Sequence, residues 1–81
     1  MLQLEFTVEP FVEGHPGLHV TAAVDAARAV GGSIEFGPVG TTCSADDGRM
    51  PGIVAALVEA AFANGASQVT MQVVRAERGG E

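Results

Sequence analysis

Apolar residues recur along the chain with two different periods, and this pattern predicts alternating strands and helices. From Leu2 to Val8 every second residue is apolar, as in a strand with one buried face, and Glu9-Pro10 ends the run. A later run, which Gly31-Gly32 ends, has the i, i+3, i+4, i+7 spacing of a helix. Its apolar residues are Val20, Ala23, Val24, Ala27 and Val30.

The middle of the chain predicts a β-hairpin. Pro38 fixes φ near the value that the second residue of a type I turn needs, and Gly40 suits the fourth position. The chain can therefore reverse between Ser33–Gly37 and Gly40–Ala45. Counting outward from a Pro38-Val39 loop sets the register. One face then holds Ile34, Phe36, Thr41 and Cys43, and the other holds Ser33, Glu35, Thr42 and Ser44.

The second half of the chain repeats the order of a helix followed by a strand. Ser44–Gly48 offers a capping residue and acidic charge ahead of a helix, and Pro51 is tolerated in a first helical turn. The helix stripe, which Asn64-Gly65 ends, consists of Ile53, Val54, Leu57, Val58, Ala61 and Phe62. Alternation at Val69, Met71 and Val73 predicts a last strand, and the polar tail from Arg75 is expected to fray.

Residues 1–81 are therefore predicted to form a single α+β domain with the element order βαββαβ. Right-handed crossovers give a four-stranded antiparallel sheet in the order 4-1-3-2 with both helices on one face, the ferredoxin-like arrangement. The residues expected together in the core include Phe6, Phe36, Leu57 and Phe62. The other face of the sheet is expected to be polar throughout, with Gln3, Glu5, Thr7, Glu35, Thr42, Ser44, Thr70 and Gln72. Such a face is either solvated or covered by a partner sheet or a ligand.

Composition and charge narrow the choice of partners. Four basic residues against ten acidic ones give a net charge of −6, which disfavours nucleic acid and anionic membranes and favours cationic ligands. A single cysteine excludes an internal disulfide, and no charged segment followed by an apolar one opens the chain, so a cytoplasmic protein is expected. A domain this small has a marginal core, which favours a homo-oligomer.

Several short segments together resemble one known family. They are the V-E-P run that ends at Pro10, Gly14, the F-G-P-V-G-T run of Phe36–Thr41 and the A-F-A-N-G-A-S run of Ala61–Ser67. In this order and spacing they resemble the small thiamine-binding, YkoF-like family along essentially the whole chain. The resemblance implies a ferredoxin-like, non-enzymatic protein without a cofactor. It further implies binding of thiamine or its hydroxymethylpyrimidine part and assembly as dimers or tetramers. The segment Asp46–Gly52 departs from the family's glycine-acidic pattern.

The candidate binding residues lie at the hairpin and on the polar face. The resemblance implies ligand contact at the threonines of the glycine turn, and the register favours Thr42 over Thr41 because Thr42 faces the open side. Glu5 and Glu35 would flank Thr42 and offer charge to a thiazolium or a protonated aminopyrimidine. Solvated glutamates and β-branched strand residues are the structural alternative. The full set of candidates is Glu5, Thr7, Glu35, Gly37, Thr41, Thr42 and Ser44.

Other chemistry finds less support in the sequence. His15 and His19 have a metal-ligand spacing, but Pro16-Gly17 separates them and no third ligand is near, so no metal site is expected. Cys43 should face the core as a small apolar thiol, and Asp46 and Asp47 are more simply explained by helix capping.

Two functions from different classes remain. One is a non-enzymatic binder of thiamine or hydroxymethylpyrimidine. The other is a structural or regulatory protein-interaction module that uses the same polar face for assembly. Neither the loop arginine of an acylphosphatase, nor a C-x-x-C metal motif, nor the aromatic sheet residues of an RNA-recognition module occurs at the corresponding places.

Overall fold

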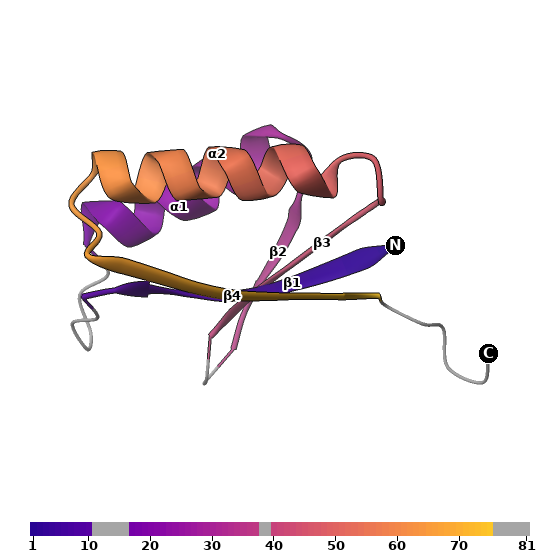
Figure 1. Cartoon of the computed structure of the whole chain (residues 1–81), viewed down its shortest axis with the longest axis horizontal. Helices are drawn as coiled ribbons and strands as arrows, with labels where there is room; N and C mark the ends of the chain where they lie inside the picture. Colours follow the sequence, from indigo (N-terminus) through magenta and orange to yellow (C-terminus); the bar gives the residue numbers. More distant parts are fainter. Residues whose placement is uncertain (11–16, 38–39, 76–81) are drawn as a thin grey trace.

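The computed structural model of the protein describes residues 1–10, 17–37 and 40–75 (Figure 1). Its strands are β1 (Leu2–Glu9), β2 (Ser33–Phe36), β3 (Thr41–Ala45) and β4 (Gln68–Arg75), and its helices are α1 (Leu18–Ala29) and α2 (Met50–Ala63). The predicted turn residues Pro38-Val39, together with Gly14 and His15, lie outside the described residues.

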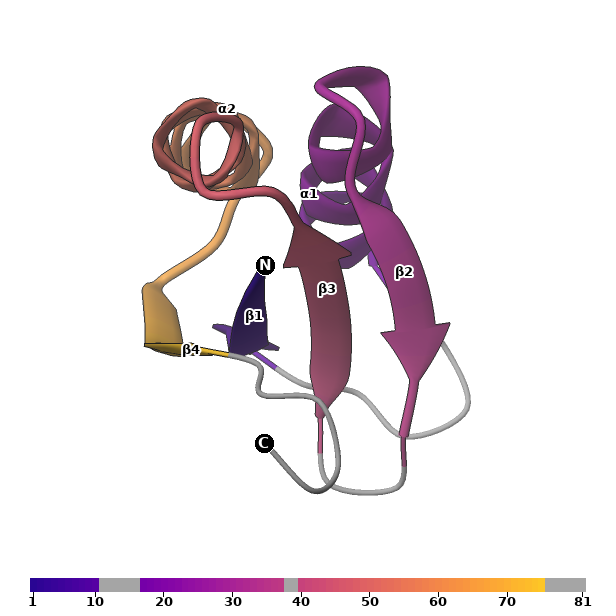
Figure 2. The same ribbon diagram turned by 90° about the vertical axis from the view of Figure 1, so that its right-hand side faces the viewer.

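The four strands form one antiparallel sheet in the order β2-β3-β1-β4, and both helices lie on one face of it (Figure 2). This order is the predicted 4-1-3-2 read from the opposite edge. The ferredoxin-like βαββαβ fold is therefore confirmed.

The predicted hairpin register is also confirmed. Glu35 pairs with Thr42 and Ile34 with Cys43, and the Gly37 N–H donates to the Gly40 carbonyl oxygen at 2.9 Å. Phe36 pairs with Thr41 on the helix-facing side. The bond between Gly37 and Gly40 lies directly beyond the Phe36–Thr41 pair, so it continues the same register to the end of the hairpin.

The core lies between the sheet and the two helices. Strand β1 runs through the centre of the sheet and sends every second side chain into the core, where Leu4 and Phe6 are almost completely buried. The small side chains of α1 let this helix pack closely against α2 and the sheet. The buried cluster comprises Leu4, Phe6, Val8, Ala23, Val24, Ala27, Cys43, Ala45, Met50, Ile53, Leu57 and Ala61.

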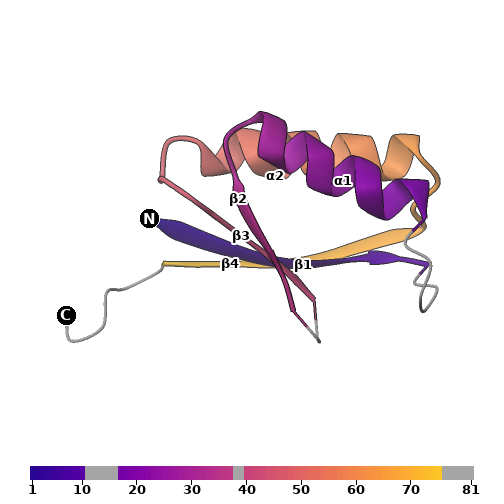
Figure 3. The same ribbon diagram turned by 180° about the vertical axis from the view of Figure 1, so that it is seen from behind.

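Two of the four expected core residues are not buried, so that prediction was wrong for them. Phe36 is 65% exposed although it is on the helix-facing side, because the hairpin end of β2 and β3 points away from the helices (Figures 1 and 3). Phe62 is 50% exposed. Each helical residue is rotated by about 100° from the one before it, so Phe62 turns away from the core when Ala61 faces it.

The predicted helix ends agree with the structure. Gly31 follows α1 and Gly65 follows α2, and both have φ of +101°, which a residue with a side chain adopts only at a cost. Asn64 also bonds to the last turn of α2, since its side-chain amide donates to the Ala60 carbonyl oxygen at 2.8 Å.

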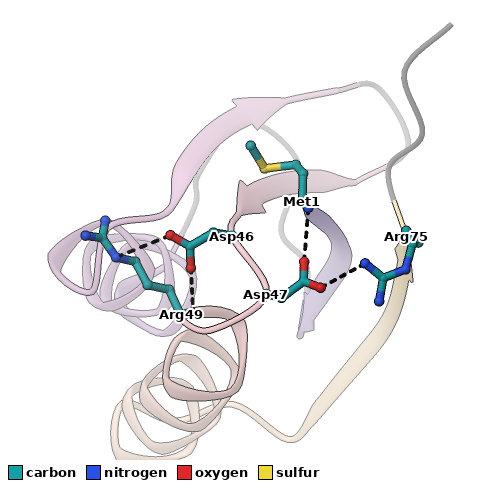
Figure 4. Close-up of polar contacts among 5 residues, drawn as sticks. All are labelled: Met1, Asp46, Asp47, Arg49 and Arg75. Atoms are coloured by element: carbon teal, nitrogen blue, oxygen red, sulfur yellow. Dashed lines mark hydrogen bonds and ion pairs between the residues drawn. The ribbon is translucent and has the colours of Figure 1, made fainter. Parts of the chain in front are cut away.

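The two aspartates before α2 do different things (Figure 4). Asp46 accepts the Arg49 N–H at 2.9 Å and so closes the turn ahead of the helix, but Arg49 is the N-cap residue and no side chain caps α2. Asp47 instead binds the Met1 ammonium group at 3.0 Å and Arg75 at 2.8 Å. The expected capping of α2 is therefore wrong for both aspartates. Arg75 is the last residue of β4 rather than the first residue of a frayed tail.

Candidate functional site

The face of the sheet that the helices leave uncovered carries the candidate site. Strand register aligns its side chains in rows that run across the strands. One row consists of Glu35 on β2, Thr42 on β3, Glu5 on β1 and Gln72 on β4. The next row consists of Ser33, Ser44, Gln3 and Val74.

A shallow hollow of about 140 Å³ lies where these two rows meet on the β3, β1 and β4 side. Its lining residues are Gln3, Glu5, Thr42, Gln72 and Val74. Four of them offer hydrogen-bonding groups, and the fifth is apolar. The expectation that this face is polar throughout was thus wrong at Val74, which pairs with Gln3 and is 43% exposed.

Negative charge dominates this face. Glu5 and Glu35 lie on either side of Thr42. Over the ranges 1–10, 17–37 and 40–75, the basic side chains lie elsewhere: Arg28 is on α1, and Arg49 and Arg75 pair with Asp46 and Asp47. The face therefore attracts cations, with a strength that salt reduces because the carboxylates are exposed.

The hollow brings together only some of the candidate binding residues. Glu5 and Thr42 line it, while Glu35 lies beside Thr42 on the outer strand β2. Ser44 lies in the second row, opposite Gln3.

The remaining candidates lie apart from the hollow. Thr7 pairs with Thr70 near the far end of β1, and Thr41 pairs with Phe6 on the helix-facing side. Gly37 holds the hairpin through its bond to Gly40.

Three lining residues were not among the candidates: Gln3, Gln72 and Val74. The alternation of β1 and β4 placed the two glutamines on the open face. Gln3 lies two residues from Glu5 on the same strand, whereas the position of Gln72 beside Glu5 depends on the pairing of β1 with β4. These are the first and last strands of the chain, so no tight turn between them fixes their register.

His19 and Cys43 both have structural roles. The His19 ring donates from Nε2 to the Pro10 carbonyl oxygen and is buried, so it links α1 to the end of β1. Cys43 is fully buried, and burial raises the pKa of its thiol, which keeps it protonated and unreactive. Within the described part of the chain, no three His, Cys, Asp or Glu side chains are grouped as a metal site would require.

Neither helix has the length and apolar character needed to cross a bilayer, as judged over the residues that the structure describes.

Comparisons with known proteins support the fold alone. No family model and no curated protein matches the sequence. Hypothetical protein MJ1052 from Methanocaldococcus jannascii matches with a TM-score of 0.61 at 20% identity, over 99% of this chain and 82% of its own. A domain of unknown function, DUF77, from Bacillus cereus matches with a TM-score of 0.54 at 23% identity, over 98% and 77%. Protein SP2199 from Streptococcus pneumoniae matches with a TM-score of 0.55 at 19% identity, over 90% and 81%. The chain thus shares its ferredoxin-like fold with small proteins from archaea and bacteria.

Proposed function

We propose that the protein binds thiamine or its hydroxymethylpyrimidine part on the open face of the sheet, without catalysing a reaction, in the cytoplasm. The observation that carries the proposal is the hollow, whose lining combines a carboxylate, two amides, a hydroxyl group and one apolar side chain. The resemblance through Gly37, Gly40 and Thr41 supports the same ligand class independently of the hollow.

The size of the hollow fits one ring of this ligand. At about 140 Å³ it is smaller than the roughly 300 Å³ at which pockets for drug-sized molecules begin. A single aromatic ring with small substituents is therefore a better match than a whole two-ring molecule. The second ring of thiamine would extend over the neighbouring surface.

The Glu35 carboxylate indicates on which side of the hollow the second ring would lie. Glu35 lies two strands from Glu5, which is about 10 Å at the usual spacing of paired strands. A pyrimidine in the hollow could thus place a cationic thiazolium ring over Thr42 and near Glu35. This carboxylate lies outside the hollow, so it would interact with the cationic ring and not with the pyrimidine.

A thermal-shift experiment with thiamine, thiamine phosphates and hydroxymethylpyrimidine tests the function. A ligand that binds only the folded protein raises the unfolding midpoint, by an amount that grows with its concentration. We expect midpoint increases with thiamine and hydroxymethylpyrimidine, and smaller ones with the phosphates because the site is acidic. An unchanged midpoint with all of these ligands at millimolar concentration would rule out the function.

We also propose that the protein associates with itself through the outer edge of β4. This strand has eight residues, and its other edge pairs with β1. It contains neither proline nor lysine, which are common means of blocking an edge, and Val73 and Val74 are both 43% exposed. Two copies of one strand can pair antiparallel about a twofold axis, so a second copy of this chain fits the edge.

A further inference from the structure

Two side chains of the hollow are direct cross-strand partners, and their pairing adds a specific recognition pattern to the function proposed above. Glu5 and Gln72 are direct partners in the register of β1 and β4, and both line the hollow. Both are exposed, so their polar groups are available to a ligand. Val74 lies two residues further along β4 on the same face and provides the apolar wall.

The hydrogen-bonding groups of this pair form a specific pattern. A carboxylate only accepts hydrogen bonds, whereas a primary amide can also donate. Side by side, Glu5 can accept while Gln72 donates. An aminopyrimidine presents the complementary edge, because its exocyclic amine donates and the adjacent ring nitrogen accepts.

We propose, on the basis of the function inferred above, that Glu5 and Gln72 read the amino group of the ligand's pyrimidine. The amine donates to the Glu5 carboxylate, and the ring nitrogen accepts from the Gln72 amide. Replacement of the amine by oxygen reverses both groups, since the oxo form presents a carbonyl acceptor beside a ring N–H donor. The Gln72 amide can turn to accept from that N–H, but the Glu5 carboxylate cannot donate to the carbonyl. Glu5 therefore carries the selection of the aminopyrimidine over its oxo analogue.

The expected selectivity is large enough to measure. A matched pair of hydrogen bonds to a base edge typically changes affinity by roughly tenfold to a hundredfold. Val74 does not distinguish the two compounds, because both offer the same planar face to it. The difference in affinity between them therefore reports on Glu5.

Isothermal titrations with hydroxymethylpyrimidine in its amino form and in its oxo form test the proposal. The parent protein should bind the amino form at least tenfold more tightly, with the matched pair of hydrogen bonds as the reason. Glu5→Gln should remove most of this preference, because a second amide can turn to donate to the oxo group. Gln72→Ala should weaken both forms, because each loses a hydrogen bond to the amide, and should leave most of the preference in place.

Matched controls lie on the same two strands and the same face. Glu9→Gln and Gln68→Ala change the pair that occupies the far end of β1 and β4, outside the hollow. Both should leave the preference unchanged, and thermal unfolding should show that all four variants fold like the parent.

The outcomes separate the two proposals. Absence of binding for both compounds would overturn the proposed function and this selectivity together. Binding of both compounds with equal affinity, a preference that survives Glu5→Gln, or affinities that Gln72→Ala leaves unchanged would overturn the selectivity mechanism alone and leave the function standing.

Discussion

At the scale of single residues, the open face and the core make opposite demands. Side chains on the open face, such as Glu35 and Thr42, contribute their polar groups, and their shape matters little to the fold. A residue in the core is limited by the space around it, as Gly32 shows: a Cβ added there would lie 2.4 Å from Cys43 Sγ and 3.0 Å from the Ala27 carbonyl oxygen. The two kinds of residue therefore call for different measurements.

For the open face, we predict that Glu35→Gln weakens thiamine more than hydroxymethylpyrimidine. Glu35 neighbours the cationic ring of thiamine in the proposed pose, and the pyrimidine alone lacks that charge. Added salt should narrow the difference, because exposed charges are screened. Thr42→Val keeps the shape but removes a donor and an acceptor inside the hollow, so it should weaken both ligands. Calorimetric titrations of the parent protein and the two variants measure these affinities. If neither substitution changes the affinity for either ligand, the site lies elsewhere.

For the core, we predict that Gly32→Ala destabilises the protein by about 1–3 kcal/mol, the usual cost of overpacking. The sulfur it would meet belongs to a fully buried side chain that cannot move away. Urea unfolding measures the change. Combining Gly32→Ala with Cys43→Ala should recover part of the loss, because the added methyl group then takes the space of the missing sulfur.

A control for this prediction is available in α2. Gly52→Ala places a Cβ 3.5 Å from Val30 Cγ1, an ordinary contact, and a helical alanine is favoured over glycine by up to about 1 kcal/mol. Equal destabilisation by the two changes would show that the contact with Cys43 is not responsible.

At the scale of elements, α2 shows how burial depends on the direction of each side chain. We predict that Leu57→Ala costs about 2–5 kcal/mol, because Leu57 is fully buried. Phe62→Ala should cost about 1 kcal/mol or less although it removes more atoms, since Phe62 is half-exposed. Gln3→Ala on the open face serves as the neutral reference. Comparable urea midpoints for Leu57→Ala and Gln3→Ala would contradict the register of this helix on the sheet.

The positions of helices and strands can be predicted from the sequence more completely than the contacts between distant elements. Period and end signals located both helices and all strands, and the turn predicted at Pro38-Val39 gave the hairpin register that the strand pairs show. How far the helices cover the sheet cannot be predicted in this way, because it depends on the twist of the sheet relative to the helix layer. For this reason Phe36 was wrongly expected in the core. The neighbours of Glu5 on β4 likewise follow from a pairing between distant strands, so Gln72 and Val74 could not be identified as lining residues.

Asp47 links the turn before α2 to the start of the chain at Met1 and to the end of β4 at Arg75. Protonation of its carboxylate should therefore loosen the end of β4. The hydrogen bond from Arg75, with further help from the Met1 ammonium group, lowers the pKa of Asp47. A carboxyl group with a lowered folded-state pKa stabilises the fold above its unfolded pKa, about 3.9 for aspartate, and loses that effect as pH falls through the lower folded value. We predict that hydrogen exchange at Val73–Arg75 accelerates, relative to the rest of β4, as pH falls below about 4.

Two variants test this role of Asp47. Asp47→Asn should show, at every pH, the faster exchange at Val73–Arg75 relative to the rest of β4 that the parent protein shows only at low pH. Asp46→Asn changes only the turn before α2 and should leave β4 as in the parent. Unaltered exchange in Asp47→Asn would show that the ion pair does not hold the end of β4.

At the scale of the whole molecule, the small core and the outer edge of β4 both favour self-association. A chain of this size buries only about 60% of its unfolded surface. The helices cover one face of the sheet, and among residues 1–10, 17–37 and 40–75 no strand pairs with the outer edge of β4. Pairing through that edge would extend the sheet and keep the hollow of each copy beside the junction, because Gln72 and Val74 belong to β4.

We predict that the protein is an oligomer at micromolar concentration, with a mass by light scattering of at least twice the 8.2 kDa of one chain. Val73→Lys places a charge at the exposed end of the β4 edge and should shift the protein toward the monomer. Leu18→Lys is the matched control, since Leu18 is 74% exposed but lies at the start of α1, and its mass should equal that of the parent. A parent mass near 8.2 kDa would exclude self-association, whereas an oligomer that survives Val73→Lys would show that the copies meet through another surface.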